Sequence, residues 1–175
     1  MADEVEIEAY DPAWPALFAD EREKLASVLP QADIVAIEHA GSTSIAGLGA
    51  KPIIDIFIAV RSIAKARSHL VAPVCGLGYV FWEDNPDPDA LFFVKGMPPF
   101  GSRRTHHVHM LLPENARWQR ALLFRDYLRS HPDTAQTYLA LKHDLACQHR
   151  NDREAYTRAK DDFITEIVAR ARRSA

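Results

Sequence analysis

Residues 53–60 constrain the fold most, because seven of these eight residues are apolar and the eighth is Asp55. Most of the seven are β-branched or aromatic, a composition that predicts a buried strand. A carboxylate is costly to bury without a partner. We therefore expect Asp55 to lie at the open end of this strand, facing a cation or a phosphate-bearing ligand.

A turn upstream of this strand contains Gly41, Ser42 and Thr43, with twelve residues between Ser42 and Asp55. The amides and hydroxyls of such a turn can hold phosphate oxygens. In the alternative interpretation, Ser42 only caps a short helix that begins near Ser44. Turn donors opposite an acidic strand suit the handling of phosphate through a divalent metal ion. Asp55 is therefore predicted to be the catalytic carboxylate and a metal ligand; the alternative is a buried aspartate bonded to backbone amides or paired with a basic side chain.

His107 and His109 form an H-x-H pair within residues 104–112, a probable strand. Because side chains alternate along a strand, both imidazoles should point to one face and Val108 to the other. Two imidazoles on one face suit a transition metal. Together with Asp55 they would form a two-histidine, one-carboxylate metal site. The alternative is a pair of histidines hydrogen-bonded within a polar face of the sheet.

Four further side chains are candidates for contact with an anionic ligand: His39, Lys51, Arg104 and Arg125. Lys51 precedes a proline, so its backbone is biased towards an extended form from which it could reach a phosphate, although a solvated lysine needs no such role. His39 adjoins the Gly-Ser turn and could face the same pocket or hydrogen-bond the turn. For the arginines, internal salt bridges are the alternative. Asp126 is not an obvious partner for Arg125, because it lies about 100° further round the helix.

A second basic group could form on the C-terminal helices, from Lys142, Tyr156 and Lys160. A strip of this kind would suit an anion. We favour the simpler interpretation, in which these residues form a solvated helix face.

Strand patterns occupy the middle of the chain and helical patterns occupy both ends. The expected strands span residues 33–38, 53–60, 79–82, 90–95 and 104–112, with a short edge strand at 5–8. The expected helices span residues 12–28, 62–71, 116–130, 132–149 and 152–173. This segregation favours an α+β fold, in which helices pack on a mixed β-sheet and the C-terminal portion is helical. Residues 1–175 are expected to form a single domain.

Composition argues against several classes of protein. The 175 residues are 47% hydrophobic and 26% charged, which suits a packed core rather than disorder. The net charge of -3 gives no support for binding nucleic acid. No apolar run approaches the ~20 residues that span a bilayer, and no signal peptide is visible. We therefore expect a cytoplasmic protein without a membrane partner, in which Cys75 and Cys147 are buried free thiols; the residues do not predict its oligomeric state.

A family resemblance is carried by residues 10–15, 39–56, 104–109 and 123–129, together with Tyr156 and Lys160. In these stretches the chain resembles the GrpB-like family of the nucleotidyltransferase superfamily. The superfamily pattern is a Gly-Ser turn followed by a strand in which two acids flank one apolar residue. Gly41-Ser42 and Asp55 match this pattern, but Phe57 stands at the position of the second acid. A two-metal site needs several carboxylates. The resemblance therefore implies a nucleotidyltransferase-like fold and does not by itself imply nucleotide transfer.

Three functions are compatible with these residues. In the first, which we favour, the protein binds a nucleotide or another phosphorylated small molecule through a divalent metal ion and transfers a nucleotidyl group to an acceptor. Mg2+ or Mn2+ would be the favoured ion, and Zn2+ an alternative. In the second, a non-catalytic module senses a phosphorylated ligand, an idea supported by Phe57. In the third, His107, His109 and Asp55 form a metal-dependent hydrolase site.

Overall fold

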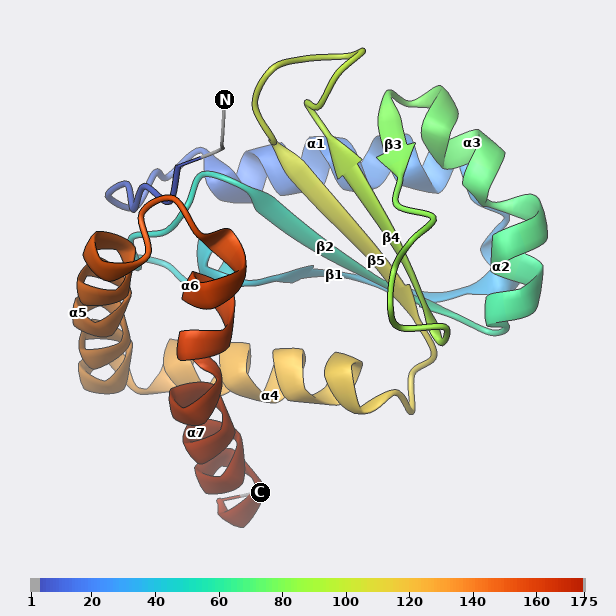
Figure 1. Ribbon diagram of the computed structural model, residues 1–175. Helices are drawn as coiled ribbons and strands as arrows, with labels where there is room; N and C mark the ends of the chain where they lie inside the picture. Colours follow the sequence, from blue (N-terminus) through green and yellow to red (C-terminus); the bar gives the residue numbers. More distant parts are fainter. Residues whose placement is uncertain (1–3, 175) are drawn as a thin grey trace.

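The computed structural model describes residues 4–174 and is built around a five-stranded sheet (Figure 1). The strands are β1 (Ile34–Ala40), β2 (Ile54–Val60), β3 (Tyr79–Phe81), β4 (Ala90–Lys95) and β5 (His106–Leu111). Their order across the sheet is β1-β2-β5-β4-β3. β2 and β5 are parallel, and the other neighbours are antiparallel. The sheet is therefore mixed, which confirms the predicted α+β class.

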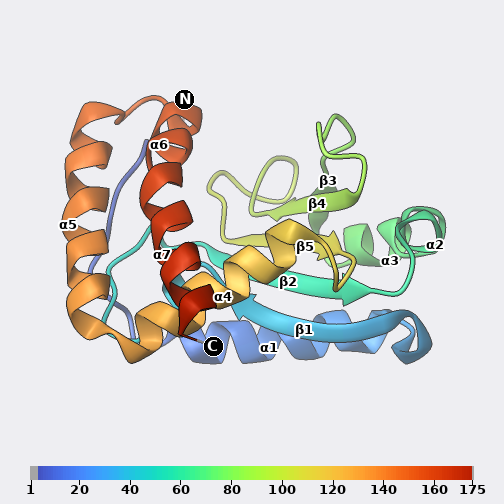
Figure 2. The ribbon, with the colours of Figure 1, turned by 90° about the horizontal axis from the view of Figure 1, so that it is seen from below.

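Helices cover both faces of the sheet and one of its ends. They are α1 (Trp14–Val28), α2 (Ile63–His69), α3 (Val71–Gly76), α4 (Ala116–Ser130), α5 (Pro132–Gln148), α6 (Arg153–Ala159) and α7 (Asp161–Arg173). Helices α1 to α3 pack on one face and α4 crosses the other, while α5 to α7 stand beside the end where β2 begins (Figure 2). None of the helices in this part of the chain combines the length and the hydropathy needed to cross a membrane.

The alternation of β2 sends its side chains to two different environments. Ile54, Ile56 and Ile58 join the main core beneath α1 to α3. Phe57 and Ala59 point the other way, into a smaller apolar cluster with Trp118 of α4. Asp55 shares this second face, so the fold places the carboxylate beneath α4 and beside the C-terminal helices.

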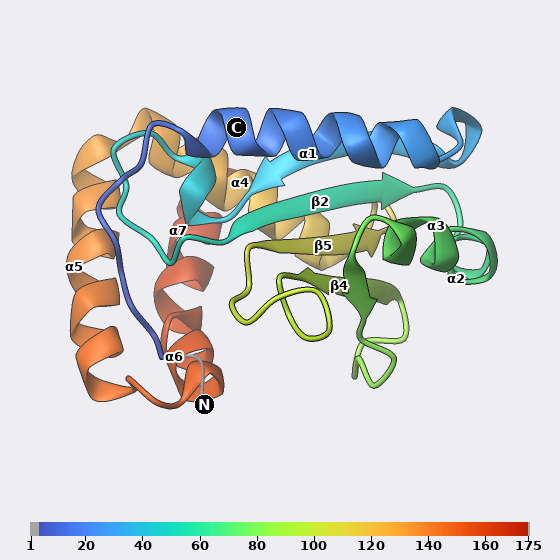
Figure 3. The ribbon, with the colours of Figure 1, turned by 90° about the horizontal axis from the view of Figure 1, so that it is seen from above.

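Several element boundaries differ from the expected ones. The helix expected at 152–173 is divided at Lys160 into α6 and α7, although no proline or glycine lies within it. Asp161 and Asp162 lie in the first turn of α7, where acids favour a helix N-terminus. The edge strand expected at 5–8 is wrong: this segment runs along α5 and makes one bridge, between Glu8 and Ala50 (Figure 3). Helix α3 was not predicted.

The two cysteines are free, as expected, but they are not both buried. Cys75 is half-buried in α3, and Cys147 is exposed on α5. The prediction of a buried thiol is wrong for Cys147 because the buried face of α5 is formed by other positions, among them Tyr138, Lys142 and Leu145.

Candidate functional site

A cavity of about 460 Å³ opens between the sheet, the Gly41 turn and the helices α4 to α7. Its wall contains seven of the residues predicted from the sequence: Gly41, Ser42, Thr43, Lys51, Asp55, His107 and His109. Helices α4 to α7 complete the wall. Segments that are far apart in the chain thus meet in one pocket.

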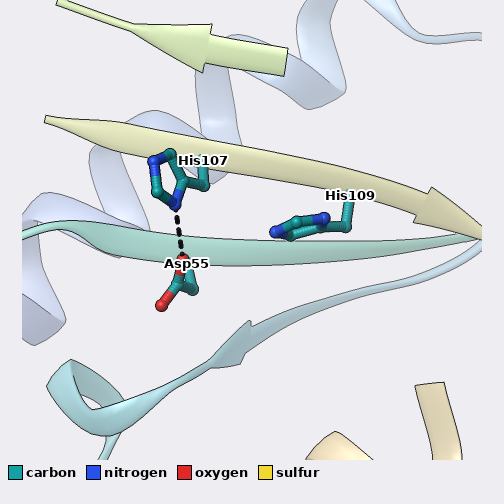
Figure 4. Close-up of side chains that lie close together, drawn as sticks. All are labelled: Asp55, His107 and His109. Carbon is teal, nitrogen blue, oxygen red and sulfur yellow. Dashed lines mark hydrogen bonds and ion pairs between the residues drawn. The ribbon is translucent and has the colours of Figure 1, made fainter. Parts of the chain in front are cut away.

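Asp55, His107 and His109 lie side by side on β2 and β5 (Figure 4). Asp55 is directly opposite His107 in the parallel register, and Phe57 is opposite His109. The Nδ1 of His107 donates a hydrogen bond to Oδ1 of Asp55 over 3.1 Å. One ligand atom from each of the three residues lies within 4.8 Å of the others. Both imidazoles are on the face of Asp55, as alternation predicts.

The chemistry of this group fits a divalent metal ion. Nε2 of His107 is buried and has no hydrogen-bond partner among residues 4–174, so a ligand atom is left over there. Burial favours protonation of Asp55, but the hydrogen bond from His107 and the nearby basic groups, Lys51 among them, outweigh it and lower the pKa of Asp55 to about 2. Burial, reinforced by Arg117, keeps the pKa of His109 well below its usual range. A carboxylate and a neutral imidazole are the forms that bind metal ions.

Gly41 allows the turn to approach Asp55 closely. Its φ of 67° lies in the region that favours glycine. A Cβ atom at this position would overlap Oδ2 of Asp55. The turn continues into the short 3₁₀ helix Ser42–Ser44, and both Ser42 and Thr43 line the cavity. The capping alternative is wrong, because Ser42 lies within this helix, Gly41 is its N-cap and no side chain caps it.

Lysines and tyrosines form the wall contributed by the C-terminal helices. Nζ of Lys160 lies 4.2 Å from the centre of the Tyr156 ring, and Nζ of Lys51 lies 5.1 Å from it. Lys142 is 2% exposed, and it stacks on Tyr138 and donates a hydrogen bond to the carbonyl of Gly49. These three lysines bring a concentration of basic groups to a cavity whose His-Asp group contains one carboxylate.

Burial and mutual repulsion depress the basicity of two of these lysines. Burial is the main cause that lowers the pKa of Lys142 to about 7, and Lys160 and Lys51 add to it. Burial likewise lowers the pKa of Lys160 to about 7, reinforced by Lys51 and opposed by Asp55. A bound anion would reverse this effect because it stabilises the charged form of each amine.

The interpretation of Lys142, Tyr156 and Lys160 as a solvated face is therefore wrong. Lys142 and Tyr156 are buried, Lys160 is half-buried, and all three line the cavity. Nothing in the sequence indicated that these three side chains share a cavity, because the cavity forms only when α5 and α6 pack beside the sheet. The stretch around Lys142, with its apolar neighbours Leu139, Leu141 and Leu145, was the signal that this lysine faces inward.

Arg125 does not line the cavity. It donates to Glu38 over 2.7 Å, to Asp126 over 2.7 Å and to the carbonyl of His39 over 3.0 Å, so it ties α4 to β1. The internal salt bridges offered as the alternative are present. The expectation that Asp126 is not its partner is wrong, because the long side chain of Arg125 folds back to reach the next residue.

His39 and Arg104 also lie outside the cavity wall. His39 is stacked on Phe18, with ring centres 4.6 Å apart, and a hydrogen bond of 3.1 Å joins its Nε2 to the hydroxyl of Thr43. Burial lowers the pKa of His39 to about 4, so it supports the turn as a neutral ring. The guanidinium of Arg104 lies 5.8 Å from the centre of the Trp82 ring. A ligand role for these residues and for Arg125 stays a prediction that the geometry of the cavity does not favour.

Comparison with known families gives a match over nearly the whole chain. The family described as "GrpB protein" matches residues 4–170. The UPF0157 protein PA4798 of Pseudomonas aeruginosa is 50% identical over 169 residues, which are 97% of this chain and 68% of that protein. A protein named dephospho-CoA kinase, from Mycolicibacterium paratuberculosis, is 31% identical over 92% of this chain, but the chain spans only 44% of its length.

Two solved structures share the architecture. The crystal structure of the conserved protein GrpB from Enterococcus faecalis has a TM-score of 0.83 and 35% identity, covering 95% of this chain and 96% of that one. The Cid1 poly(U) polymerase with bound MgGTP has a TM-score of 0.54 and 16% identity, covering 78% of this chain and 43% of that one. At that identity the second likeness concerns the fold alone.

Proposed function

Because the chain belongs to the GrpB family and its fold is nucleotidyltransferase-like, we propose that its cavity binds a nucleotide or another phosphorylated small molecule through a divalent metal ion. In this proposal Asp55, His107 and His109 hold the ion. Gly41, Ser42 and Thr43 hold phosphate oxygens on one side, and Lys51, Lys142 and Lys160 hold them on the other. The reaction that suits this arrangement is transfer of a nucleotidyl group to an acceptor.

One observation carries the proposal: a possible metal centre and a cluster of lysines face the same cavity. Neither feature alone would indicate such a ligand, since a His-Asp pair is often structural and a lysine is often solvated. Lys142 and Lys160 are instead held where their charge is penalised by burial. An anionic ligand that also binds a metal ion, such as a nucleoside triphosphate, would satisfy both groups at once.

In nucleotidyl transfer, an acceptor oxygen forms a bond to the α-phosphorus of the donor while the bond from that phosphorus to the β-phosphate oxygen breaks. The acceptor loses its proton and diphosphate leaves. A bound divalent ion supplies charge neutralisation on the phosphate oxygens. The lysines of this chain would stabilise the negative charge that builds up on the departing diphosphate, and the Gly41 turn would orient the chain of phosphates.

The binding step can be tested by a thermal-shift and calorimetry screen of nucleotides with Mg2+, Mn2+ or Zn2+. Dephospho-CoA belongs in the screen, since one relative has the name dephospho-CoA kinase. A ligand present at about 100 times its Kd should stabilise the fold by about 2.7 kcal/mol, and only with a metal ion if the proposal is right. Metal-independent stabilisation, or none with any compound, would contradict it.

The affinity for inorganic tripolyphosphate should also depend on pH. Above about pH 7 the free protein holds Lys142 and Lys160 increasingly as neutral amines, so binding an anion requires proton uptake. The affinity should therefore fall between about pH 7 and pH 9, by up to about tenfold per pH unit for each proton taken up. Because tripolyphosphate itself loses a last proton in this range, its own titration is measured without protein and subtracted. Calorimetry in buffers of different ionisation enthalpy measures the proton uptake directly.

A matched pair of variants distinguishes a specific contact between Lys142 and the ligand from the effect of removing any one positive charge from the protein. Lys142→Met should bind tripolyphosphate more weakly at pH 7 and show a flatter pH dependence. Lys65→Met removes an exposed lysine of α2, on the opposite face of the sheet, and should retain the wild-type profile. A pH dependence that is unchanged in Lys142→Met would show that this lysine does not contact the ligand.

Phe57 favours a second candidate, a binding module that performs no transfer. Its ring packs against His109 and Trp118, with ring centres 4.8 Å and 6.4 Å away, and supplies no ligand for a second ion. Turnover distinguishes the two: release of diphosphate in the presence of acceptor candidates supports transfer, and tight binding without turnover supports the module. Hydrolysis with bound Zn2+ and no affinity for nucleotide would instead favour a hydrolase using the same three residues.

A further inference from the structure

We propose that Arg117 is the second cationic group of the metal centre and binds ligand phosphate beside the ion. This inference rests on the proposed function and adds a residue to the same site. Arg117 was not singled out in the sequence, because it lies in a helix that carries several other arginines.

The position of Arg117 connects the metal ligands to the open mouth of the cavity. It lies in the first turn of α4, is solvent-exposed and lines the cavity. Its Nη2 donates a hydrogen bond to Nδ1 of His109 over 3.1 Å. This nitrogen is then the acceptor of the neutral ring, so in our proposal Arg117 leaves it and turns its donors to the ligand when His109 binds the metal ion. The guanidinium carbon lies 6.0 Å from the centre of the Phe57 ring. A positive charge therefore stands over the apolar ring, next to a proposed metal ligand.

The charge of Arg117 is not neutralised by a close acid. Among residues 4–174 no carboxylate lies within salt-bridge distance of it, and its side chain makes one hydrogen bond, to His109. Burial lowers the pKa of Arg117 and outweighs the effect of Asp87 and Asp55, which act on it only from a longer range. Arg120, three residues further along α4, also lines the cavity but donates to Asp161 over 2.7 Å and to Thr165 over 3.0 Å. A guanidinium has five N–H donors. Arg117 thus keeps most of its donors for a ligand, whereas the donors of Arg120 are engaged by Asp161 and Thr165.

The three proposed metal ligands leave room for a further positive charge beside the ion. A centre with one carboxylate and two imidazoles suits a single divalent ion, and one ion leaves much of the charge of a di- or triphosphate uncompensated. In two-metal sites the second ion neutralises the remaining oxygens. Here Phe57 offers no ligand for that ion, and the planar fork of Arg117 can bind two phosphate oxygens instead.

A purely structural role makes different predictions. If Arg117 only held the ring of His109, its loss would disturb the metal ligands and weaken binding of the metal ion itself. If Arg117 binds phosphate, its loss weakens binding of the phosphate and does not weaken binding of the metal ion alone, because Arg117 competes with the ion for His109. Calorimetry with Mn2+ alone, and then with inorganic tripolyphosphate in the presence of Mn2+, separates the two roles.

Arg117→Gln is the test variant and Arg120→Gln the matched control, since both remove one positive charge from the cavity side of α4. Arg117→Gln should weaken tripolyphosphate binding by about 10- to 100-fold, the loss expected for one charge-assisted contact. Arg120→Gln should weaken it by less than about threefold, and neither variant should bind Mn2+ alone more weakly than the wild type. Arg117→Lys keeps the positive charge and should retain more affinity for tripolyphosphate than Arg117→Gln. The lysine variant also serves as a second test if Arg117→Gln fails to fold.

The relative losses of affinity in these variants decide whether Arg117 binds phosphate. Equal losses in Arg117→Gln and Arg120→Gln, or in Arg117→Gln and Arg117→Lys, would overturn the inference, because a specific cationic contact would then be absent. A parallel loss of Mn2+ binding in Arg117→Gln would overturn it in favour of the structural role. Wild-type protein that binds neither Mn2+ nor tripolyphosphate would remove the proposed function itself, whereas wild-type binding that is indifferent to Arg117 would remove only this inference.

Discussion

Asp55→Asn should lower the affinity for Mn2+ by about 100-fold or more, since loss of an outer-shell partner alone costs about 10- to 100-fold. The substitution keeps the shape of the side chain and removes the negative charge of the proposed metal centre. Asp55 is also the only carboxylate in the group with His107 and His109. Direct titration calorimetry, or the electron paramagnetic resonance signal of free Mn2+, measures the loss.

Asp161→Asn is the appropriate control for this result. Asp161 lines the same cavity but pairs with Arg120 over 2.7 Å and lies outside the metal group. Its replacement should change the affinity for Mn2+ by less than about threefold. An Asp55→Asn protein that binds Mn2+ as well as this control would show that the ion is not held by Asp55.

Gly41→Ala should both destabilise the fold and disable the site. The methyl group would overlap Oδ2 of Asp55 in a turn whose backbone is unfavourable for alanine. Backbone strain of this kind costs about 1–3 kcal/mol, and the overlap adds to it, so we expect a loss of about 3 kcal/mol and a fall in Tm of roughly 6–12 °C. Displacement of Asp55 should also reduce Mn2+ affinity in the fraction that remains folded.

Gly47→Ala provides a control that shares the backbone cost. Gly47 has a φ of 77°, yet a Cβ atom built on it would have no neighbour within 4 Å. We expect a loss of about 1 kcal/mol and unchanged affinity for Mn2+. If Gly41→Ala were no more harmful than Gly47→Ala, the close approach of the turn to Asp55 would be unimportant.

Local patterns predicted the elements that depend on near neighbours. The apolar residues 53–60 correspond to β2, and Pro132 begins α5 as expected. Alternation correctly placed His107 and His109 on one face. The division of residues 152–173 at Lys160 was missed because no proline or glycine marks it. Helix α3 was missed although Pro73 lies in its first turn, because it is six residues long and follows α2 directly.

Prediction of the site failed where the decisive contact comes from a distant segment. Arg125 and Lys142 are both basic residues in helices with apolar neighbours, and the sequence alone does not tell their roles apart. In the folded chain Arg125 meets Glu38 and lies outside the cavity, while Lys142 meets Gly49 and lines it. The packing of α4 and α5 against β1 and the turn that precedes β2 makes this difference.

The sequence by itself determined which residues could form a metal and phosphate site: a lone acid in an apolar strand, a Gly-Ser turn before it and two alternating histidines. Only the tertiary structure decided that Lys142, Lys160 and Arg117 join them, and that Arg125 does not. The physical reason is that strand alternation is a local property of the backbone, readable over a few residues. The charge environment of a helical side chain depends instead on which distant surface its helix covers.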